Sequence, residues 1–285
     1  PVVQLPVTHL QPGEVRLRFA AGQAHSQQEA YEQAIDYFRR AADILRERAP
    51  DLSTPFLLHY ALTLQLSGRT GEAVELLSDD RLDQIDFLQR YTALAQGRMT
   101  DETRPVLLEV LQQLAQRHPG NPWVVMSLGL HHYAEKDYAA ADQAFARVEP
   151  LAIESGHIPE DSAPPALPAV FYFWRGAALE RMDRIEEADR QFRRALQVDE
   201  NLTEAQNYLA YMWAERGKHL EEGLALINRA LAALPGNGAF LDTRGWIYFM
   251  MGRYEEALVD LNRAAEIEED AVIYDHLGDT YRKLG

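Results

Sequence analysis

The stretch that decides the fold reads Gly245-Trp246-Ile247-Tyr248, then Gly252-Arg253-Tyr254-Glu255-Glu256-Ala257, and finally Ala264. Small residues alternate with aromatic ones on both sides of a short turn. The arrangement recurs along the chain with a period of about 34 residues, which is typical of repeat architectures. Three further copies and a final half copy are Gly129, Tyr138, Ala141 and Phe145; Gly176, Ala188, Phe192 and Ala195; Ala210, Trp213, Gly217 and Ala230; and Tyr274, Leu277, Gly278, Tyr281 and Gly285.

The recurring small residues have a physical purpose. Two antiparallel helices can approach closely only where glycine or alanine removes side-chain bulk. Large side chains such as Tyr248 and Phe192 then fill the space that remains. Each helix pair leaves one face exposed, and stacking the next pair buries that face, so stability depends on nearest neighbours. The pattern therefore predicts an all-α solenoid.

These residues resemble the tetratricopeptide repeat (TPR) family, whose first helix carries a small residue and an aromatic and whose second carries Ala, an aromatic and Ala. The resemblance implies a right-handed α-α superhelix of antiparallel helix pairs. Residues 169–285 also resemble a subfamily of bacterial repeat proteins, through segments such as Asn207-Tyr208-Leu209-Ala210 and Leu241-Asp242-Thr243-Arg244. Many members of that subfamily carry envelope-targeting N-termini, so the resemblance favours the periplasm or the outer membrane over the cytoplasm.

The repeat boundaries follow from the period and from the turn residues. Pro119-Gly120-Asn121 and Pro235-Gly236-Asn237 combine a residue that ends a helix with an asparagine that caps the next one. We expect an extended lead-in at 1–14, about four repeats, some degenerate, in 15–155, and three repeats with a half repeat in 169–285. The expected units are 15–48, 54–87, 88–121, 122–155, 169–202, 203–237, 238–270 and 271–285.

A proline-rich insertion interrupts the repeats at residues 156–168, where Pro159, Pro164, Pro165 and Pro168 occur. Prolines at this density predict a loop. A tolerated surface loop is the favoured interpretation, and a lid over the groove is the functional alternative. A break that divides the stack into two arms is the third.

The composition excludes several classes of partner. The net charge is −16, which repels nucleic-acid phosphates and anionic lipid headgroups. No stretch reaches the roughly 18 uninterrupted apolar residues of a membrane span, so we expect no membrane insertion by these residues. Cysteine is absent, which excludes disulfides and thiolate chemistry. No leader is visible at Pro1-Val2-Val3, and we expect the natural chain to be longer than these residues.

Catalytic and metal-binding motifs are missing from the sequence. The adjacent His131 and His132 would point in different directions on a helix, which is wrong for joint metal ligation. No phosphate-binding loop, nucleophile elbow or zinc-binding helix occurs. We therefore expect no catalytic residues, no metal and no cofactor.

The groove of a TPR superhelix is lined, by resemblance, by the first helix of each repeat at offsets 2, 5, 9 and 12. Rings on such a face supply contact area at low entropic cost, and asparagine can bond peptide amides. The alternative interpretation is that several of these rings pack between repeats. The predicted partner-binding residues are Trp123, Met126, Leu130, Tyr133, Phe173, Asn207, Tyr211, Asp242, Trp246, Phe249, Asp275 and Asp279.

Carboxylate-tail binders of the family carry lysine and arginine at offsets where this chain has Glu204, Asn207 and Asp242. The basic clamp is therefore absent. An acidic, aromatic groove predicts instead a protein or peptide partner with apolar and basic side chains.

Two functions remain open on the sequence. The first is a non-catalytic scaffold or adaptor that binds a peptide or protein in its groove. The second is a regulatory or substrate-recruiting arm of a larger enzyme. The half repeat at 271–285 suggests a third possibility, self-association, in which the exposed last helix pairs with that of a second copy.

Overall fold

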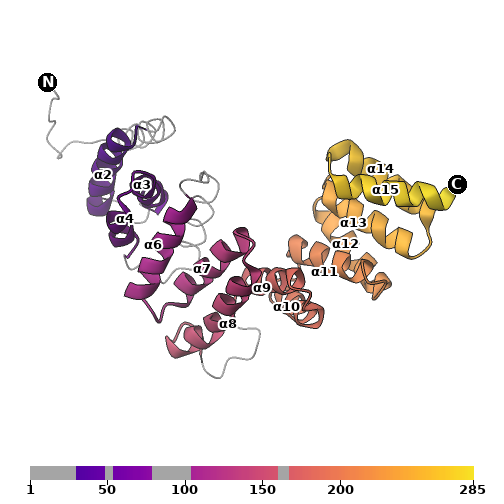
Figure 1. The fold of residues 1–285 in the computed structure, drawn as a ribbon, viewed down its shortest axis with the longest axis horizontal. Helices are drawn as coiled ribbons and strands as arrows, with labels where there is room; N and C mark the ends of the chain where they lie inside the picture. The colour runs from indigo at the N-terminus through magenta and orange to yellow at the C-terminus, as the bar shows by residue number, and fades with distance from the viewer. Residues whose placement is uncertain (1–29, 49–53, 79–103, 160–166) are drawn as a thin grey trace. The chain divides into compact units, whose positions relative to one another are not determined.

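The computed structural model describes residues 30–48, 54–78, 104–159 and 167–285, which form helices joined mostly by short turns (Figure 1). No strand occurs among these residues, and the predicted all-α repeat class is confirmed. The expected lead-in 1–14, residues 15–29, the junction of units 54–87 and 88–121, and residues 160–166 of the insertion lie outside the described residues. The boundaries of the expected units stay predictions.

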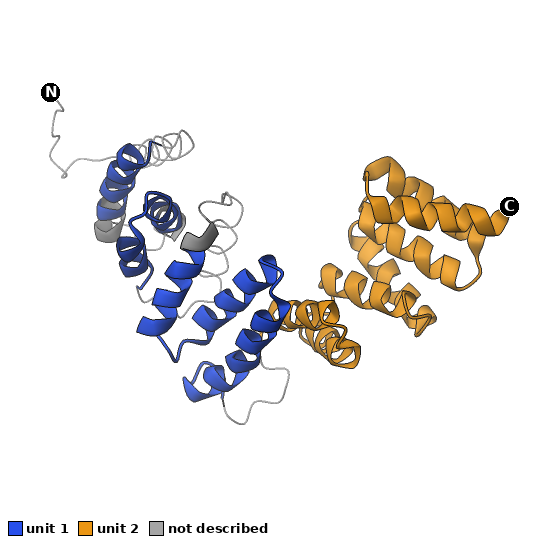
Figure 2. Cartoon of the chain, viewed as in Figure 1, with its two compact units in different colours: residues 1–160 blue, residues 161–285 orange. Residues whose placement is uncertain are grey.

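The chain divides into two compact units, residues 1–160 and residues 161–285 (Figure 2). In unit 1, each described helix packs against the next described one, from α2 to α8. Its helices are α2 (Tyr31–Arg48), α3 (Thr54–Leu66), α4 (Thr70–Leu77), α6 (Arg104–Arg117), α7 (Pro122–Ala134) and α8 (Tyr138–Glu154).

Unit 2 contains three helix pairs and a final single helix. The pairs are α9 (Ala169–Arg181) with α10 (Ile185–Val198), α11 (Thr203–Ala214) with α12 (Leu220–Ala233), and α13 (Gly238–Met250) with α14 (Tyr254–Ile267). The last helix is α15 (Ala271–Leu284). Each first helix packs on its own second helix, and that second helix packs on the first helix of the next pair.

The asparagines of the two Pro-Gly-Asn turns cap helices as predicted. Asn121 Oδ1 accepts hydrogen bonds from the backbone N–H groups of Trp123 and Val124, at 2.9 and 3.2 Å. Asn237 Oδ1 accepts one from Phe240 N–H at 3.0 Å. These bonds satisfy amides that the first turn of a helix leaves without partners. Each first helix after such a turn therefore begins at a defined residue.

Close approach of the paired helices is visible at three glycines. A Cβ atom added at Gly129 would lie 2.6 Å from the ring of Phe145, and one at Gly176 would lie 3.0 Å from the ring of Phe192. At Gly245 it would lie 2.7 Å from Leu261. The bulky partner is fully buried in each case. The glycines therefore allow a large side chain to fill the interface, as the sequence predicted.

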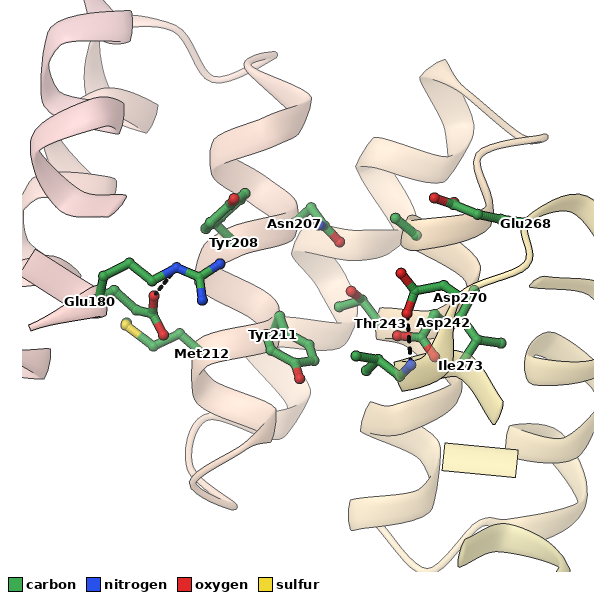
Figure 3. A pocket seen from close by; sticks show the side chains of 13 residues that line it. Glu180, Asn207, Tyr208, Tyr211, Met212, Asp242, Thr243, Glu268, Asp270 and Ile273 are labelled. Carbon is green, nitrogen blue, oxygen red and sulfur yellow. Dashed lines mark hydrogen bonds and ion pairs between the residues drawn. The ribbon is translucent and has the colours of Figure 1, made fainter. Parts of the chain in front are cut away.

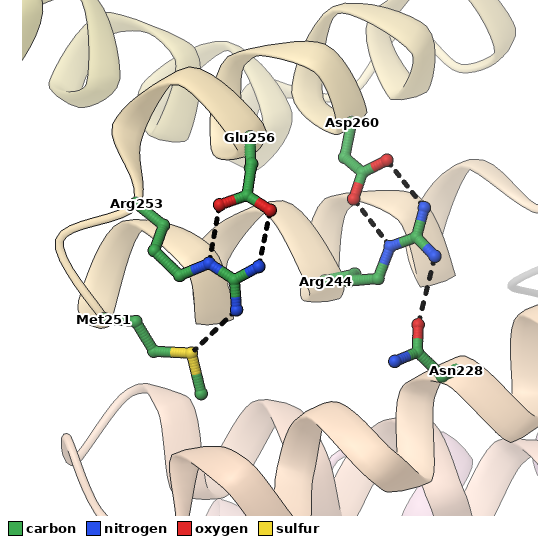
Figure 4. Close-up of polar contacts among 6 residues, drawn as sticks. All are labelled: Asn228, Arg244, Met251, Arg253, Glu256 and Asp260. Carbon is green, nitrogen blue, oxygen red and sulfur yellow. Dashed lines mark hydrogen bonds and ion pairs between the residues drawn. The ribbon is translucent and has the colours of Figure 1, made fainter.

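A polar staple ties neighbouring repeats of unit 2 together (Figure 4). Arg244 on α13 donates to both carboxylate oxygens of Asp260 on α14, over 2.6 and 2.8 Å. The third bond runs to Asn228 Oδ1 on α12, at 3.1 Å. Asp260 is buried, with 5 % of its surface exposed. Because a fork-to-fork pair fixes orientation as well as distance, it holds α12, α13 and α14 in register.

We expect Asp260→Asn to lower the free energy of unfolding by about 1–2 kcal/mol, because a charge-assisted hydrogen bond to a buried carboxylate is lost. Urea unfolding followed by circular dichroism measures the change. Glu266→Gln, an exposed charge removal on the same helix, is the matched control. Equal stability of the two variants would mean that the hydrogen bonds of Asp260 do not stabilise the fold.

Candidate functional site

The first helices of unit 2 form a continuous inner face. α9 contacts α11, α11 contacts α13, and α13 contacts α15. The second helices α10, α12 and α14 make no comparable contacts with one another in this described unit. Because the first helices lie closer together than the second ones, unit 2 is concave on the side of the first helices.

A pocket of about 400 Å³ opens on this inner face (Figure 3). Its walls come from the end of α9, from the middle of α11, from α13, and from the start of α15 with the turn before it. Its lining residues are Glu180, Arg181, Asn207, Tyr208, Tyr211, Met212, Ala239, Asp242, Thr243, Glu268, Asp270, Val272 and Ile273. Its volume lies in the range of about 300–1,000 Å³ in which ligand sites are usually found.

Tyr211 projects from α11 into the pocket, where Figure 3 shows its ring between α11 and α13. Burial raises the pKa of its hydroxyl to about 12, and the negative charges of Glu215, Asp242 and Glu180 and a hydrogen bond to Glu215 add to the rise. An ordinary tyrosine loses its proton near pH 10. The Tyr211 hydroxyl therefore keeps its proton to still higher pH, and it already has a hydrogen bond to Glu215.

Asp242 on α13 forms a buried pair with His276 on α15. Nδ1 of His276 lies 2.8 Å from Oδ1 of Asp242, and the two residues expose only 7 % and 6 % of their surface. The imidazole ring stacks on Trp246, with centroids 4.1 Å apart and planes 12° apart. The stack and the hydrogen bond together fix the Asp242 carboxylate at the pocket wall.

Two buried polar atoms near this face have no hydrogen-bond partner. They are Oδ1 of Asn207, a pocket-lining residue, and Nε1 of Trp246. A buried polar atom without a partner costs about 1–3 kcal/mol. Both atoms have less than 1 Å² of accessible surface, so neither is open to a ligand in this conformation. Asn207 is the one of the two that lines the pocket.

The structure brings three of the predicted groove residues together in the pocket, namely Asn207, Tyr211 and Asp242. Trp246 and Phe249 stack on each other at 4.6 Å beside them. Asp275 is exposed on α15. Asp279 pairs with Arg282 of the same helix. The structure thus gives the positions and contacts of these residues. That any of them binds a partner stays a prediction.

Other predicted residues lie mainly in the helix packing. Phe173 is 6 % exposed, and its ring contacts those of Phe192 and Tyr208, so it fills the α9–α10–α11 interface. In unit 1, Trp123 and Met126 are buried, at 7 % and 1 % exposure. Leu130 and Tyr133 are half-buried, and the Tyr133 ring meets the edge of Tyr138 on α8. Trp123 and Met126 are therefore buried in unit 1, and this ring contact of Tyr133 lies within its own helix pair.

The pocket also contains residues that the offsets of the first helices did not select. Glu268 and Asp270 come from the turn between α14 and α15, and Ile273 from the first turn of α15. His276, which holds Asp242, lies 34 residues after it. The sequence could have indicated this pair, because residues one repeat period apart occupy equivalent positions on neighbouring first helices. The turn residues carried no such signal, since their direction depends on the local backbone.

Among the described residues, no group of three or more histidine and acidic side chains is arranged to hold a metal ion. In the same part of the chain, no helix combines the length and the apolar character that crossing a membrane requires.

Two sequence profiles of the tetratricopeptide repeat family match the sequence. One matches residues 238–271, and the other matches residues 6–51 and 175–238. No curated protein matches the chain. The repeats recognised in this way include all of α11, α12, α13 and α14, which contribute two of the helices that line the pocket.

Solved structures of repeat proteins share the fold. YrrB, described as a TPR protein with an unusual peptide-binding site, is 16% identical with a TM-score of 0.52, covering 72% of this chain and 96% of YrrB. A tetratricopeptide repeat protein from Parabacteroides merdae is 16% identical with a TM-score of 0.50, covering 94% and 99%. MamA is 18% identical with a TM-score of 0.50, covering 61% and 94%. At these identities the likeness concerns the fold alone.

Proposed function

Because the chain belongs to the tetratricopeptide repeat family, we propose that it is a protein-interaction scaffold whose unit 2 holds an extended segment of a partner. The segment lies against the inner faces of α9, α11, α13 and α15. The observation that carries the proposal is the pocket around Tyr211, to which all four of these helices contribute. Stacked repeats favour this role, since they offer an extended concave surface.

An extended polypeptide fits the chemistry of the face. The half-buried ring of Tyr211 offers apolar area to a side chain of the segment. The side-chain amide of Asn207 also lines the pocket, and an amide can form hydrogen bonds with a peptide backbone. In this arrangement main-chain contacts supply affinity and the pocket supplies selectivity, which is the common division in peptide recognition. The walls formed by Tyr211, Met212 and Ile273 suit the apolar parts of the partner's side chains.

YrrB, which has a similar fold, is described as having an unusual peptide-binding site. The resemblance supports the proposal by showing that an array of this kind can hold a peptide. It does not assign the same residues to this chain, because the two sequences are only 16% identical.

The proposal is tested by selecting a phage-displayed library of random linear peptides on the whole immobilised chain. We expect the parent protein to retain a family of binding peptides, and Tyr211→Ala to weaken the best of them by about tenfold or more in fluorescence polarisation. The loss follows from removing the central ring of the pocket.

The matched control is Tyr281→Ala, which removes an exposed tyrosine of α15 that does not line the pocket. It should bind as the parent does. If no peptide is retained, or if folded Tyr211→Ala binds as tightly as the parent, the proposed groove is wrong. Circular dichroism establishes that the variants are folded.

A further inference from the structure

We propose that the pocket of unit 2 accepts one cationic side chain of the bound segment, a lysine or an arginine, against the carboxylate of Asp242. The inference rests on the proposed function, since it specifies what the bound segment presents. It also explains why the carboxylate on this wall is fixed in place.

The pocket lining is strongly acidic. Four carboxylates line it, from Glu180, Asp242, Glu268 and Asp270, whereas the lining contains one cationic side chain, Arg181. The Nε atom of that guanidinium lies 3.7 Å from a carboxylate oxygen of its neighbour Glu180, so it offsets a charge already within the pocket. The lining therefore carries an excess of negative charge, and a cation is its electrostatic complement.

Two of these carboxylates also affect the Tyr211 hydroxyl. Besides burial, it is the negative charges of Glu215, Asp242 and Glu180 that raise the pKa of its hydroxyl. A negative potential that discourages loss of a proton also attracts a positive group. Asp242 and Glu180, which line the pocket, therefore act electrostatically on the Tyr211 side chain between them.

Asp242 is the carboxylate best prepared to receive that cation. His276 holds its Oδ1 at 2.8 Å, and the imidazole is itself held by stacking on Trp246. A carboxylate can accept several hydrogen bonds, so one bond to His276 leaves capacity for a donor from the pocket side. Because the carboxylate is already immobilised, little conformational entropy is lost when a ligand binds.

The remaining walls suit the hydrocarbon stem of a basic side chain. The ring of Tyr211 and the side chains of Met212 and Ile273 line the same pocket. Lysine and arginine bury their methylene groups against apolar surface while the charged end reaches a polar partner. An aspartate or glutamate of a partner would meet four like charges instead, and would be excluded.

The test begins with the peptides that the parent chain selects from the random library. We expect lysine or arginine to be enriched at one position of the retained peptides relative to the unselected library. Asp242→Asn should still retain peptides but lose this enrichment, because asparagine keeps an oxygen acceptor for His276 while losing the charge. Glu255→Gln, an exposed charge removal on α14 outside the pocket, is the matched control and should keep the enrichment.

A double-mutant cycle then isolates the contact. A selected peptide is synthesised with its basic residue and with norleucine in that place, which keeps the stem and removes the ammonium or guanidinium. We expect the replacement to weaken binding to the parent by roughly tenfold or more, and binding to Asp242→Asn by much less. The peptide is also made with an acetylated N-terminus. This removes the charge of the terminal amine, so any binding that remains dependent on charge comes from the side-chain cation.

The outcomes separate this inference from the proposed function. Retention of no peptides overturns the proposed function, and this inference with it. Peptides without basic enrichment, an equal norleucine effect in Asp242→Asn and parent, or loss of binding on acetylation alone overturns only the inference. If Asp242→Asn does not fold, the exposed rim variant Glu268→Gln decides: it should weaken the basic peptide about threefold and leave the norleucine peptide unchanged.

Discussion

Phe192→Ala is expected to lower the free energy of unfolding of unit 2 by about 3–5 kcal/mol, the usual cost of removing a fully buried aromatic ring. The ring is completely buried between α9, α10 and α11. It lies against Gly176 and contacts the rings of Phe173 and Tyr208, with centroids 6.0 and 5.9 Å away. Because Gly176 has no side chain to move into the space, the cavity cannot close from that side.

The measurement is hydrogen exchange of the whole chain in increasing urea, because a repeat array need not unfold in one step. Exchange assigns the loss to residues 161–285 and leaves residues 1–160 as an internal reference. Tyr274→Ala removes an aromatic residue that is 52 % exposed, and it should change stability by less than about 0.5 kcal/mol. A similar loss in both variants would mean that Phe192 does not hold the repeat interface.

The fold could be predicted from sequence because its cause is local and repeated. A glycine or alanine in one helix and a bulky residue in the next recur with a fixed period, and each copy supports the interpretation of the others. Gly129, Gly176 and Gly245 were predicted as points of close approach, and the structure confirms each by a short distance to its bulky partner. The capping roles of Asn121 and Asn237 were predictable for a similar reason, since a cap acts within three residues.

The candidate site could be predicted only in part. Asn207, Tyr211 and Asp242 lie together because their offsets place them on the inner face of neighbouring first helices. Glu268 and Asp270 belong to a turn, whose backbone direction no periodicity specifies. For aromatic residues the offset does not decide between the groove and the packing, since both lie on the same side of a helix. Phe173 and Tyr211 show the two outcomes. Both are aromatic residues of a first helix, but Phe173 is buried in an interface and Tyr211 lines the pocket.

Gly245→Val is expected to destabilise unit 2 by about 3 kcal/mol, toward the upper end of the usual cost of overpacking a core. A Cβ atom at this position would lie 2.7 Å from Leu261 Cγ and 3.2 Å from the backbone oxygen of Ala257. The leucine can rotate away only into a filled core, and the carbonyl belongs to the backbone of α14. Intrinsic helix propensity favours valine slightly over glycine, so a destabilisation would come from packing alone.

Gly278→Val provides the matched control for this prediction. Gly278 lies in α15 at the position that corresponds to Gly245 in α13, and a Cβ atom there would meet nothing within 4 Å. Its variant should stay within about 0.5 kcal/mol of the parent in the same urea experiment. Leu261→Ala should rescue part of the loss in Gly245→Val, because the two side chains compete for one space and their effects are not additive. Equal losses in both glycine variants, or no rescue, would show that close approach of α13 and α14 is not what requires the glycine.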